Sequence, residues 1–510
     1  MSVLSRHLLN KLSVRASRFD ISIPFWVTAF AIAAWSAAAA WINPAQFADS
    51  LEQFAWAHGV ELGYWKHPPL PTWLIIAPIR LIGFSIYWTY ALAATCFAGT
   101  AFFTWLITQR LFGQQAAVFA VLLIGLHIGF SWRAQLYNHN TVLILCVAAT
   151  VWATLRALDS GKKTSWFLVG MLAGLAMLSK YQALVPLLGI VLTLQLGGWL
   201  KQRAVWQGVC VAMVAAFLVF SPHLIWMALG SGSTIDNAFN AAQGLSFTKR
   251  LTVFFGFWLI QIRFHLPILI AVALLVLFRK NAPEIALSGS DTETPCKQQT
   301  RAWFVGLVVW PAFFVSMAVL LGGMRLEAQW GLQTFQFVVV FIAWQLAMAL
   351  PHSDLKRTIL VVVFAQLLLA AFFTWSILQP QQQFWQGARS RNFPALAVSK
   401  EITAKWYEAT TCPLKFVVGP SFEAVIVAAY SGSNPAVVED SDFKKSPWVN
   451  AENLQTSGAL YLATDAAKLP SGLSKSGQLV IPARLNDYQP TKQLFWGVML
   501  PPTDCKPALQ

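Results

Sequence analysis

A series of apolar runs constrains this chain more than any other feature, because most of them approach the ~20 residues that a helix needs to cross a bilayer. We predict about eleven or more spans, at residues 23–42, 86–109, 114–131, 140–157, 165–179, 182–200, 205–228, 264–278, 302–321, 331–350 and 358–378. Composition agrees: 57% of the residues are hydrophobic and 11% are charged, against about 45–50% and about 25% in soluble domains. The expected fold class is a polytopic α-helical membrane protein.

The basic residues predict an orientation for these spans. The net charge is +15, but the cations form short clusters between apolar runs, as the positive-inside rule expects of cytoplasmic loops. Nucleic acid is therefore not an expected partner. With a cytoplasmic N-terminus, the loops alternate consistently, and the first run is expected to be an uncleaved span. We therefore expect a multi-pass membrane protein with its N-terminus in the cytoplasm.

The chain becomes more polar after residue 378. Residues 415–419, 436–438, 459–464, 479–482 and 494–500 are typical of strands, and 422–430 of a helix. This alternation predicts a small extracytoplasmic α/β domain. We therefore divide the chain into a transmembrane domain, 1–378, with a first external loop at 43–85, and a periplasmic domain, 379–510. Cys412 and Cys505 form a disulfide in an oxidising compartment or remain two free thiols.

The first external loop is unusually acidic. Asp49, Glu52, Gln53 and Trp56 recur at the spacing of one helix face. Acidic groups at a membrane boundary are costly to desolvate, so they indicate function. The prolines of Lys66-His67-Pro68-Pro69 predict an extended, rigid corner. We expect 70–83, and likewise 247–262, to lie along the membrane surface rather than to cross it.

Several motifs together resemble a known family. The acidic segment is followed by Gly63–Leu74, GYWKHPPLPTWL, and further along the chain come Tyr137–Thr141, Leu178–Tyr181, Ser221–Trp226 and Leu326–Trp330. In this order they resemble bacterial GT-C glycosyltransferases related to protein O-mannosyltransferases and to the aminoarabinose transferases of lipid A. The family's usual Asp-Glu pair is Asp49-Ser50 here, with the second carboxylate displaced to Glu52.

The resemblance implies a multi-pass protein of the bacterial inner membrane. It implies transfer of a sugar from a polyprenyl phosphate to an acceptor at the outer face of that membrane, with inversion and without a cofactor or metal. Asp49 is then the catalytic base or the group that orients the acceptor, rather than only a helix N-cap. Glu52 shares this role or lies on a solvated helix face. Lys66 and His67 are expected to bind the donor phosphate or sugar, unless they contact lipid headgroups.

Other residues are assigned by charge and place. The candidates for holding the donor phosphate are Lys66, His67, Arg133, Lys180, Arg263 and Arg325; each of the last four is otherwise a headgroup contact. The candidates for sugar or acceptor binding are Gln53, Tyr64, Asn138, His139, Glu327 and Trp330. Asn138 and His139 equally fit a helix N-terminus, and His223 fits a packed helix. Arg263 is expected to be buried within its apolar stretch.

Three classes of function stay open on the sequence. The first is the glycosyltransferase, with a glycolipid such as lipid A or lipopolysaccharide as favoured acceptor and a protein serine or threonine as alternative. The second is a transporter or flippase of lipid-linked sugars, although no internal repeat of the kind found in many transporters is present. The third is a non-catalytic membrane partner. We expect a monomer in contact with membrane lipids.

Overall fold

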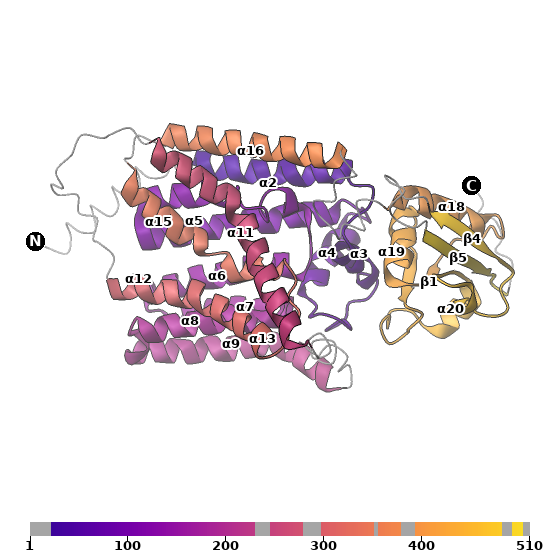
Figure 1. The fold of residues 1–510 in the computed structure, drawn as a ribbon. Helices are drawn as coiled ribbons and strands as arrows, with labels where there is room; N and C mark the ends of the chain where they lie inside the picture. The colour runs from indigo at the N-terminus through magenta and orange to yellow at the C-terminus, as the bar shows by residue number, and fades with distance from the viewer. Residues whose placement is uncertain are drawn as a thin grey trace, which may run out of the picture.

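Helices make up the first three quarters of the chain (Figure 1). The computed structural model describes residues 22–229, 245–278, 297–350, 355–378, 393–481 and 492–502. The helices before residue 379 are α2 (Ser22–Ile42), α3 (Ala48–Trp56), α4 (Leu70–Leu81), α5 (Trp88–Ile124), α6 (His139–Ser160), α7 (Lys163–Ser179), α8 (Leu184–Leu196), α9 (Arg203–Ala228), α11 (Phe247–Leu277), α12 (Lys297–Phe304), α13 (Trp310–Leu320), α14 (Trp330–Phe335), α15 (Val338–Ala349) and α16 (Leu355–Leu378).

Within the described residues, seven helical stretches are long and apolar enough to cross a membrane. They are α2, α5, α6, α9, α11, the combined α12–α13 stretch Lys297–Leu320, and α16. Every predicted span coincides largely with a helix, but α7, α8 and α15 are shorter, and two predicted spans fall on α5. A kink at Gly113 (φ 83°) divides α5, a conformation that glycine adopts without the strain of a side chain. The helical membrane fold is confirmed, but the predicted number of eleven spans is not.

The segment 247–262 is not a helix separate from the predicted span at 264–278, and its position along the membrane surface stays a prediction. Residues Phe247–Leu277 form one continuous helix, α11, that passes through Arg263 and Pro267. Arg250 fixes the start of this helix, because its guanidinium donates to the carbonyls of Leu320 (3.1 Å) and Leu321 (2.9 Å) at the end of α13. The helix prediction for 70–83 is confirmed as α4, which has 12 residues and is too short to span a bilayer.

The C-terminal domain contains one five-stranded sheet. Its elements are α18 (Ala395–Tyr407), β1 (Phe416–Gly419), α19 (Ser421–Tyr430), β2 (Ala436–Glu439), α20 (Ala451–Ser457), β3 (Ala459–Ala463), β4 (Lys475–Ile481) and β5 (Lys492–Met499). The strand order is β2-β1-β3-β5-β4. Strand β1 pairs in parallel with β2 and β3, while β5 runs antiparallel to β3 and β4. The predicted small α/β domain is therefore present.

This domain sits at one end of the helical domain, where α19 lies beside α3 (Figure 1). The hydroxyl of Tyr430 accepts a hydrogen bond from the backbone N–H of Gln46 (3.2 Å). A ring nitrogen of His58 lies 3.1 Å from the carbonyl oxygen of Asn434. The first loop is thus packed between the helices and the sheet. Cys412 is buried and disulfide-bonded, whereas Cys505 lies outside the described residues, so their pairing stays a prediction.

Candidate functional site

Helix α3 presents its acidic side chains because its other face is anchored. Leu51, Phe54 and Trp56 are buried, and the Ser50 hydroxyl donates to the carbonyl of Tyr137 (2.9 Å). The N-cap residue is Phe47, which makes no side-chain cap. The alternative that Asp49 serves as an N-cap is therefore wrong, and its carboxylate is available for other contacts.

The corner after α3 is a closed turn, not the extended segment that we predicted. Tyr64 and His67 exchange backbone hydrogen bonds, N–H to O at 3.0 and 3.2 Å. Pro69 already has helical angles (φ −85°, ψ −18°) and begins α4. Tyr64 also stacks on Trp56 with ring centroids 5.1 Å apart. The turn places Lys66 against α3.

Asp49 is held by side chains from three distant segments. Its Oδ2 accepts from the amide of Asn138 (3.2 Å) and from that of Gln329 (3.4 Å). Its Oδ1 lies 3.9 Å from the ammonium of Lys66. Asn138 has two roles at once, because its Oδ1 also caps α6 by accepting from the N–H groups of Asn140 and Thr141. The helix N-terminal role predicted for Asn138 is thus confirmed, and its binding of a sugar stays a prediction.

Lys66 and Glu52 form the strongest ion pair of the site. The ammonium donates to both oxygens of Glu52, at 2.8 and 3.0 Å. Burial raises the pKa of Glu52 to about 7, with Lys66 acting in the opposite direction and Asp49 adding to the rise. Burial opposes ionisation of Lys66, but the charges of Glu52 and Asp49 outweigh it and raise the Lys66 pKa. The charge of Glu52 is therefore sensitive to pH near neutrality.

A second buried cation lies at the end of α7. Lys180 donates to Oδ1 of Asn140 (2.7 Å), and its ammonium is 4.9 Å from the ring centroid of Trp330. Burial lowers the pKa of Lys180 to about 7, although Asp49 and Glu327 favour the charged form. Binding of an anion beside Lys180 would favour its ammonium form.

Two histidine rings adjoin this cation. The centroids of His67 and His139 are 3.7 Å apart. Burial, and then the charges of Lys66 and Lys180, lower the His67 pKa well below its usual value, so the ring is neutral. Nε2 of His67, Nδ1 of His139 and Nδ2 of Asn140 are buried without a hydrogen-bond partner among the described residues. Buried polar atoms are normally satisfied, so this group suits a polar ligand.

The remaining predicted residues differ in their positions. Gln53 and Tyr64 stabilise the loop itself: Gln53 accepts from the Thr72 hydroxyl (2.8 Å), and Tyr64 donates to the Gly59 carbonyl (2.8 Å). His223 also joins the loop to α9, since its ring contacts the carbonyl of Leu62 at 2.7 Å. These contacts explain why the loop is ordered.

The predicted arginines do not gather with Lys66 and Lys180 around Asp49. Arg133 packs against the ring of Phe264, with 5.6 Å from its guanidinium carbon to the centroid. Arg325 is exposed, and so is Glu327, although Glu327 acts on the charge of Lys180. The expectation that Arg263 is buried is wrong: it lies on an exposed face of α11. A single span does not reveal which of its faces packs against a neighbour.

The sequence did not indicate two further polar residues of the site. Gln329 lies in the Leu326–Trp330 motif, but nothing in that motif distinguishes it from its neighbours. Glu439, at the end of β2, accepts a hydrogen bond from the indole of Trp65 (2.8 Å). It comes from the C-terminal domain, and no spacing along the chain links it to the first loop.

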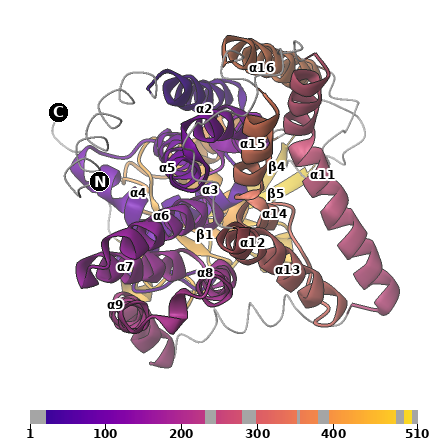
Figure 2. The same ribbon diagram turned by 90° about the vertical axis from the view of Figure 1, so that its left-hand side faces the viewer.

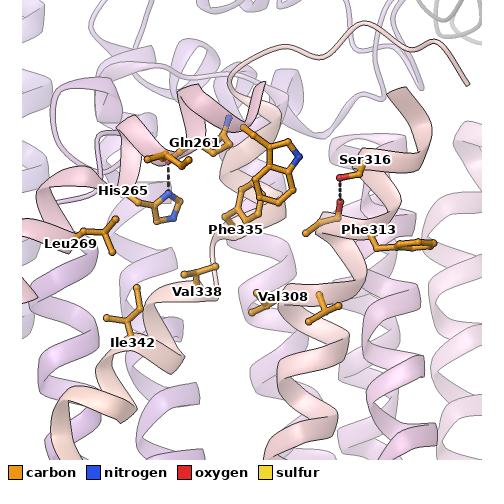
Figure 3. Close-up of a pocket in the computed structure, with 13 residues that line it drawn as sticks. Gln261, His265, Leu269, Val308, Phe313, Ser316, Phe335, Val338 and Ile342 are labelled. Carbon is orange, nitrogen blue, oxygen red and sulfur yellow. Dashed lines mark hydrogen bonds between the residues drawn. The ribbon is translucent and has the colours of Figure 1, made fainter. Parts of the chain in front are cut away.

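An apolar cavity opens beside the site between α11, α13 and α15 (Figure 3). It has a volume of about 610 Å³ and is lined by Phe313, Phe335 and other apolar side chains, with Gln261, His265 and Ser316 as polar groups. A second cavity of about 1260 Å³ shares Leu269, Val338 and Ile342 with it and extends to Lys297 and Arg301. Both are lined in part by α11, which lies on the side of the helical domain away from α7 and α9 (Figure 2).

One polar side chain of the first cavity contacts the segment that holds Asp49. The amide of Gln261 donates to the carbonyl of Ala328 (3.0 Å), and the next two residues, Gln329 and Trp330, contact Asp49 and Lys180. Within the described part of the chain, no three His, Cys, Asp or Glu side chains form a metal-binding group. That the reaction needs no metal stays a prediction.

Comparison with known proteins agrees with the resemblance. Residues 66–226 match the family described as dolichyl-phosphate-mannose-protein mannosyltransferase. The chain is 25% identical over 182 residues, 35% of its length, to the lipopolysaccharide core galacturonosyltransferase RgtA of Rhizobium johnstonii, and this match spans 36% of that relative. It is 22% identical over 339 residues, 66% of its length and 68% of the relative, to the lipid A galacturonosyltransferase RgtD of the same organism.

Among solved structures, ArnT from Cupriavidus metallidurans shares the fold. The form bound to undecaprenyl phosphate matches with a TM-score of 0.57 and 12% identity, over 93% of this chain and 97% of that one. The apo form matches with a TM-score of 0.56 and 12% identity, over 98% of both chains. The family match and the relatives thus agree with the resemblance to GT-C glycosyltransferases of the protein O-mannosyltransferase and aminoarabinose transferase type, and the solved structures show the same fold.

Proposed function

We propose that the protein transfers a sugar from a polyprenyl phosphate to a glycolipid acceptor such as lipid A or lipopolysaccharide. The observation that carries the proposal is the environment of Asp49, whose carboxylate is fixed by Lys66, Asn138 and Gln329 beside a buried cation, Lys180. The relatives act on lipid A or the lipopolysaccharide core, and the structural neighbour was crystallised with undecaprenyl phosphate. These similarities support a lipid-linked sugar donor and a glycolipid acceptor.

The chemistry follows from this arrangement. The acceptor hydroxyl oxygen attacks the anomeric carbon of the sugar, and the bond from that carbon to the phosphate oxygen breaks with inversion. Asp49 takes the hydroxyl proton, which a positioned carboxylate does efficiently. The leaving polyprenyl phosphate gains negative charge, which Lys180 and Lys66 stabilise. The donor brings its own leaving group, so we propose no metal or cofactor.

The apolar cavities along α11 suit the lipid of the donor. They share three lining residues, are lined mostly by apolar side chains, and are linked by Gln261 to the segment that holds Asp49. A polyprenyl chain there would place its phosphate near Lys180. We further propose that the protein acts as a monomer in the inner membrane, with a cytoplasmic N-terminus and a periplasmic C-terminal domain that covers the site.

Sugar transfer by the purified protein in nanodiscs tests this proposal. A panel of undecaprenyl-phosphate sugars is offered with lipid A or lipopolysaccharide core as acceptor, with and without EDTA, and products are read by mass spectrometry. We expect transfer that EDTA does not change and that Asp49→Asn lowers by about 10²–10⁴-fold. Asp159→Asn is the control, because Asp159 is exposed and pairs with Arg110 at the far end of α6.

Other outcomes have clear meanings. Full activity of Asp49→Asn would refute the assigned base and turn attention to Glu52. Transfer to a serine or threonine peptide, but not to glycolipid, would replace the acceptor. Movement of the intact lipid-linked sugar across the bilayer without transfer would support a flippase instead.

A further inference from the structure

One carboxylate of the C-terminal domain is buried at the edge of the site. Glu439 ends β2 and is 0% exposed. Its Oε2 accepts from the indole N–H of Trp65 (2.8 Å), and its backbone N–H donates to the Ser446 hydroxyl (2.9 Å). Its other oxygen, Oε1, is buried without a hydrogen-bond partner among the described residues. An unsatisfied buried oxygen is costly and needs an explanation.

Charged groups surround this carboxyl on several sides. Glu52 and Lys66 lie close enough to act on its charge from the first loop, and Asp440 acts on it from the next position along the chain. Lys445 pairs with Asp440 (2.8 Å), and its ammonium lies 4.4 Å from the ring centroid of Trp65. Lys66 therefore pairs with Glu52 and Asp49, and its charge is also favoured by Glu439.

The backbone here is also unusual. Asp440 and Ser441 follow Glu439 with positive φ angles of 52° and 60°. Such conformations cost energy in residues other than glycine and cluster at functional sites. Gly59 of the first loop faces this region closely, since a Cβ there would lie 3.0 Å from Cβ of Trp448. The contact between loop and domain is thus closely fitted at this point.

We propose that Glu439 is a positioning residue of the transferase site, supplied by the C-terminal domain, which holds Trp65 and the adjacent Lys66 in place. This inference rests on the proposed transferase function. With Glu439 neutral, Lys66 is directed to Glu52 and Asp49. With Glu439 ionised, it competes for Lys66 and repels Glu52, so the contacts of Asp49 loosen.

The charge state of Glu439 is set to change near physiological pH. Burial, and then the charge of Glu52, raises its pKa to about 8, while the hydrogen bond from Trp65 and the charge of Lys66 act in the opposite direction. The protonated, active form is present below that pH and is lost above it. If one ionisation near 8 controls activity, kcat/KM falls about tenfold by pH 9.

The pH dependence of transfer by the full-length protein in nanodiscs tests the inference. Glu439→Gln keeps the shape and remains neutral. Between pH 7 and 9 we expect its kcat/KM to fall about tenfold less than that of the wild type, because the loss caused by deprotonation of Lys180 is common to both. Glu401→Gln is the control: Glu401 is exposed on α18 of the same domain, and we expect a wild-type profile.

A second variant keeps the Glu439 carboxyl but raises its pKa. Trp65→Phe removes the hydrogen bond that favours the ionised form, so the alkaline loss of activity should move to higher pH. If the wild type transfers sugar but both variants lose kcat/KM at alkaline pH to the same extent as it does, the inference alone is overturned. Absence of transfer by the wild type at every pH overturns the proposed function, and this inference with it.

Discussion

The ion pair between Lys66 and Glu52 allows a quantitative test by Lys66→Met, which keeps the length of the side chain and removes its charge. Breaking a fully buried pair costs about 3–5 kcal/mol, and an exposed pair contributes about 0–1 kcal/mol. These side chains are 32% and 15% exposed, so the cost falls between the two ranges. We expect about 2 kcal/mol when Glu52 is ionised.

The cost should depend on pH with a definite sign. The pKa of Glu52 in the folded protein, about 7, is above its ordinary value, so below pH 7 the carboxyl is neutral and loses little when Lys66 is removed. Above pH 7 the wild type keeps an ionised, paired Glu52, whereas the variant must bury it unpaired or protonate it. Lys66 stays charged throughout, because its own pKa is raised. The difference in stability therefore grows as the pH rises.

Thermal unfolding followed by intrinsic fluorescence in nanodiscs measures this difference. At pH 8.5 we expect the Tm of Lys66→Met to lie about 2–5 °C below that of the wild type, and at pH 5.5 within about 1 °C of it. Lys163→Met is the control, because Lys163 is an exposed lysine at the start of α7. Its Tm should match that of the wild type at both pH values. An equal shift at both pH values, or a larger one at pH 5.5, would refute the role assigned to Glu52.

Two further substitutions probe the framework of the site. Gly63→Ala should lower the stability of the fold by about 1–3 kcal/mol, because a Cβ there would lie 2.5 Å from the Trp226 ring and 2.7 Å from the His223 ring; an unchanged Tm would show that the loop yields easily. Asn138→Asp keeps the oxygen that caps α6 but replaces the amide that donates to Asp49 with a second carboxylate. We expect kcat to fall about 100-fold with little change in Tm; steady-state kinetics with activity near wild type would contradict that contact.

The sequence predicted the parts of the molecule that depend on local pattern. The helix with Asp49 and Glu52 on one face appears as α3, and the apolar runs and the strands of the C-terminal domain lie close to their expected positions. The turn at Tyr64–His67 was missed because its two backbone hydrogen bonds compete with the extended preference imposed by the prolines. Local preferences alone do not decide such a competition.

The residues that complete the site depend on long-range packing. Gln329 reaches Asp49 across 280 positions of the chain, and neither its type nor its neighbours indicate that contact. The exposure of Arg263 depends on how α11 is rotated against the other helices, which its nearly uniform apolar sequence leaves open. Only the tertiary structure contains this information.

The contact between the first loop and the C-terminal domain also has a consequence for biosynthesis. The hydrogen bond from Gln46 to Tyr430 joins residues 384 positions apart, and that from Trp65 to Glu439 joins residues 374 apart. The loop therefore emerges from the ribosome several hundred residues before its partners. Contacts of such sequence separation form late and slowly, so a newly inserted chain must keep its acidic loop unassembled until the C-terminal domain has been made. Truncation before Tyr430 would then remove activity from a chain that keeps helices α2 to α16.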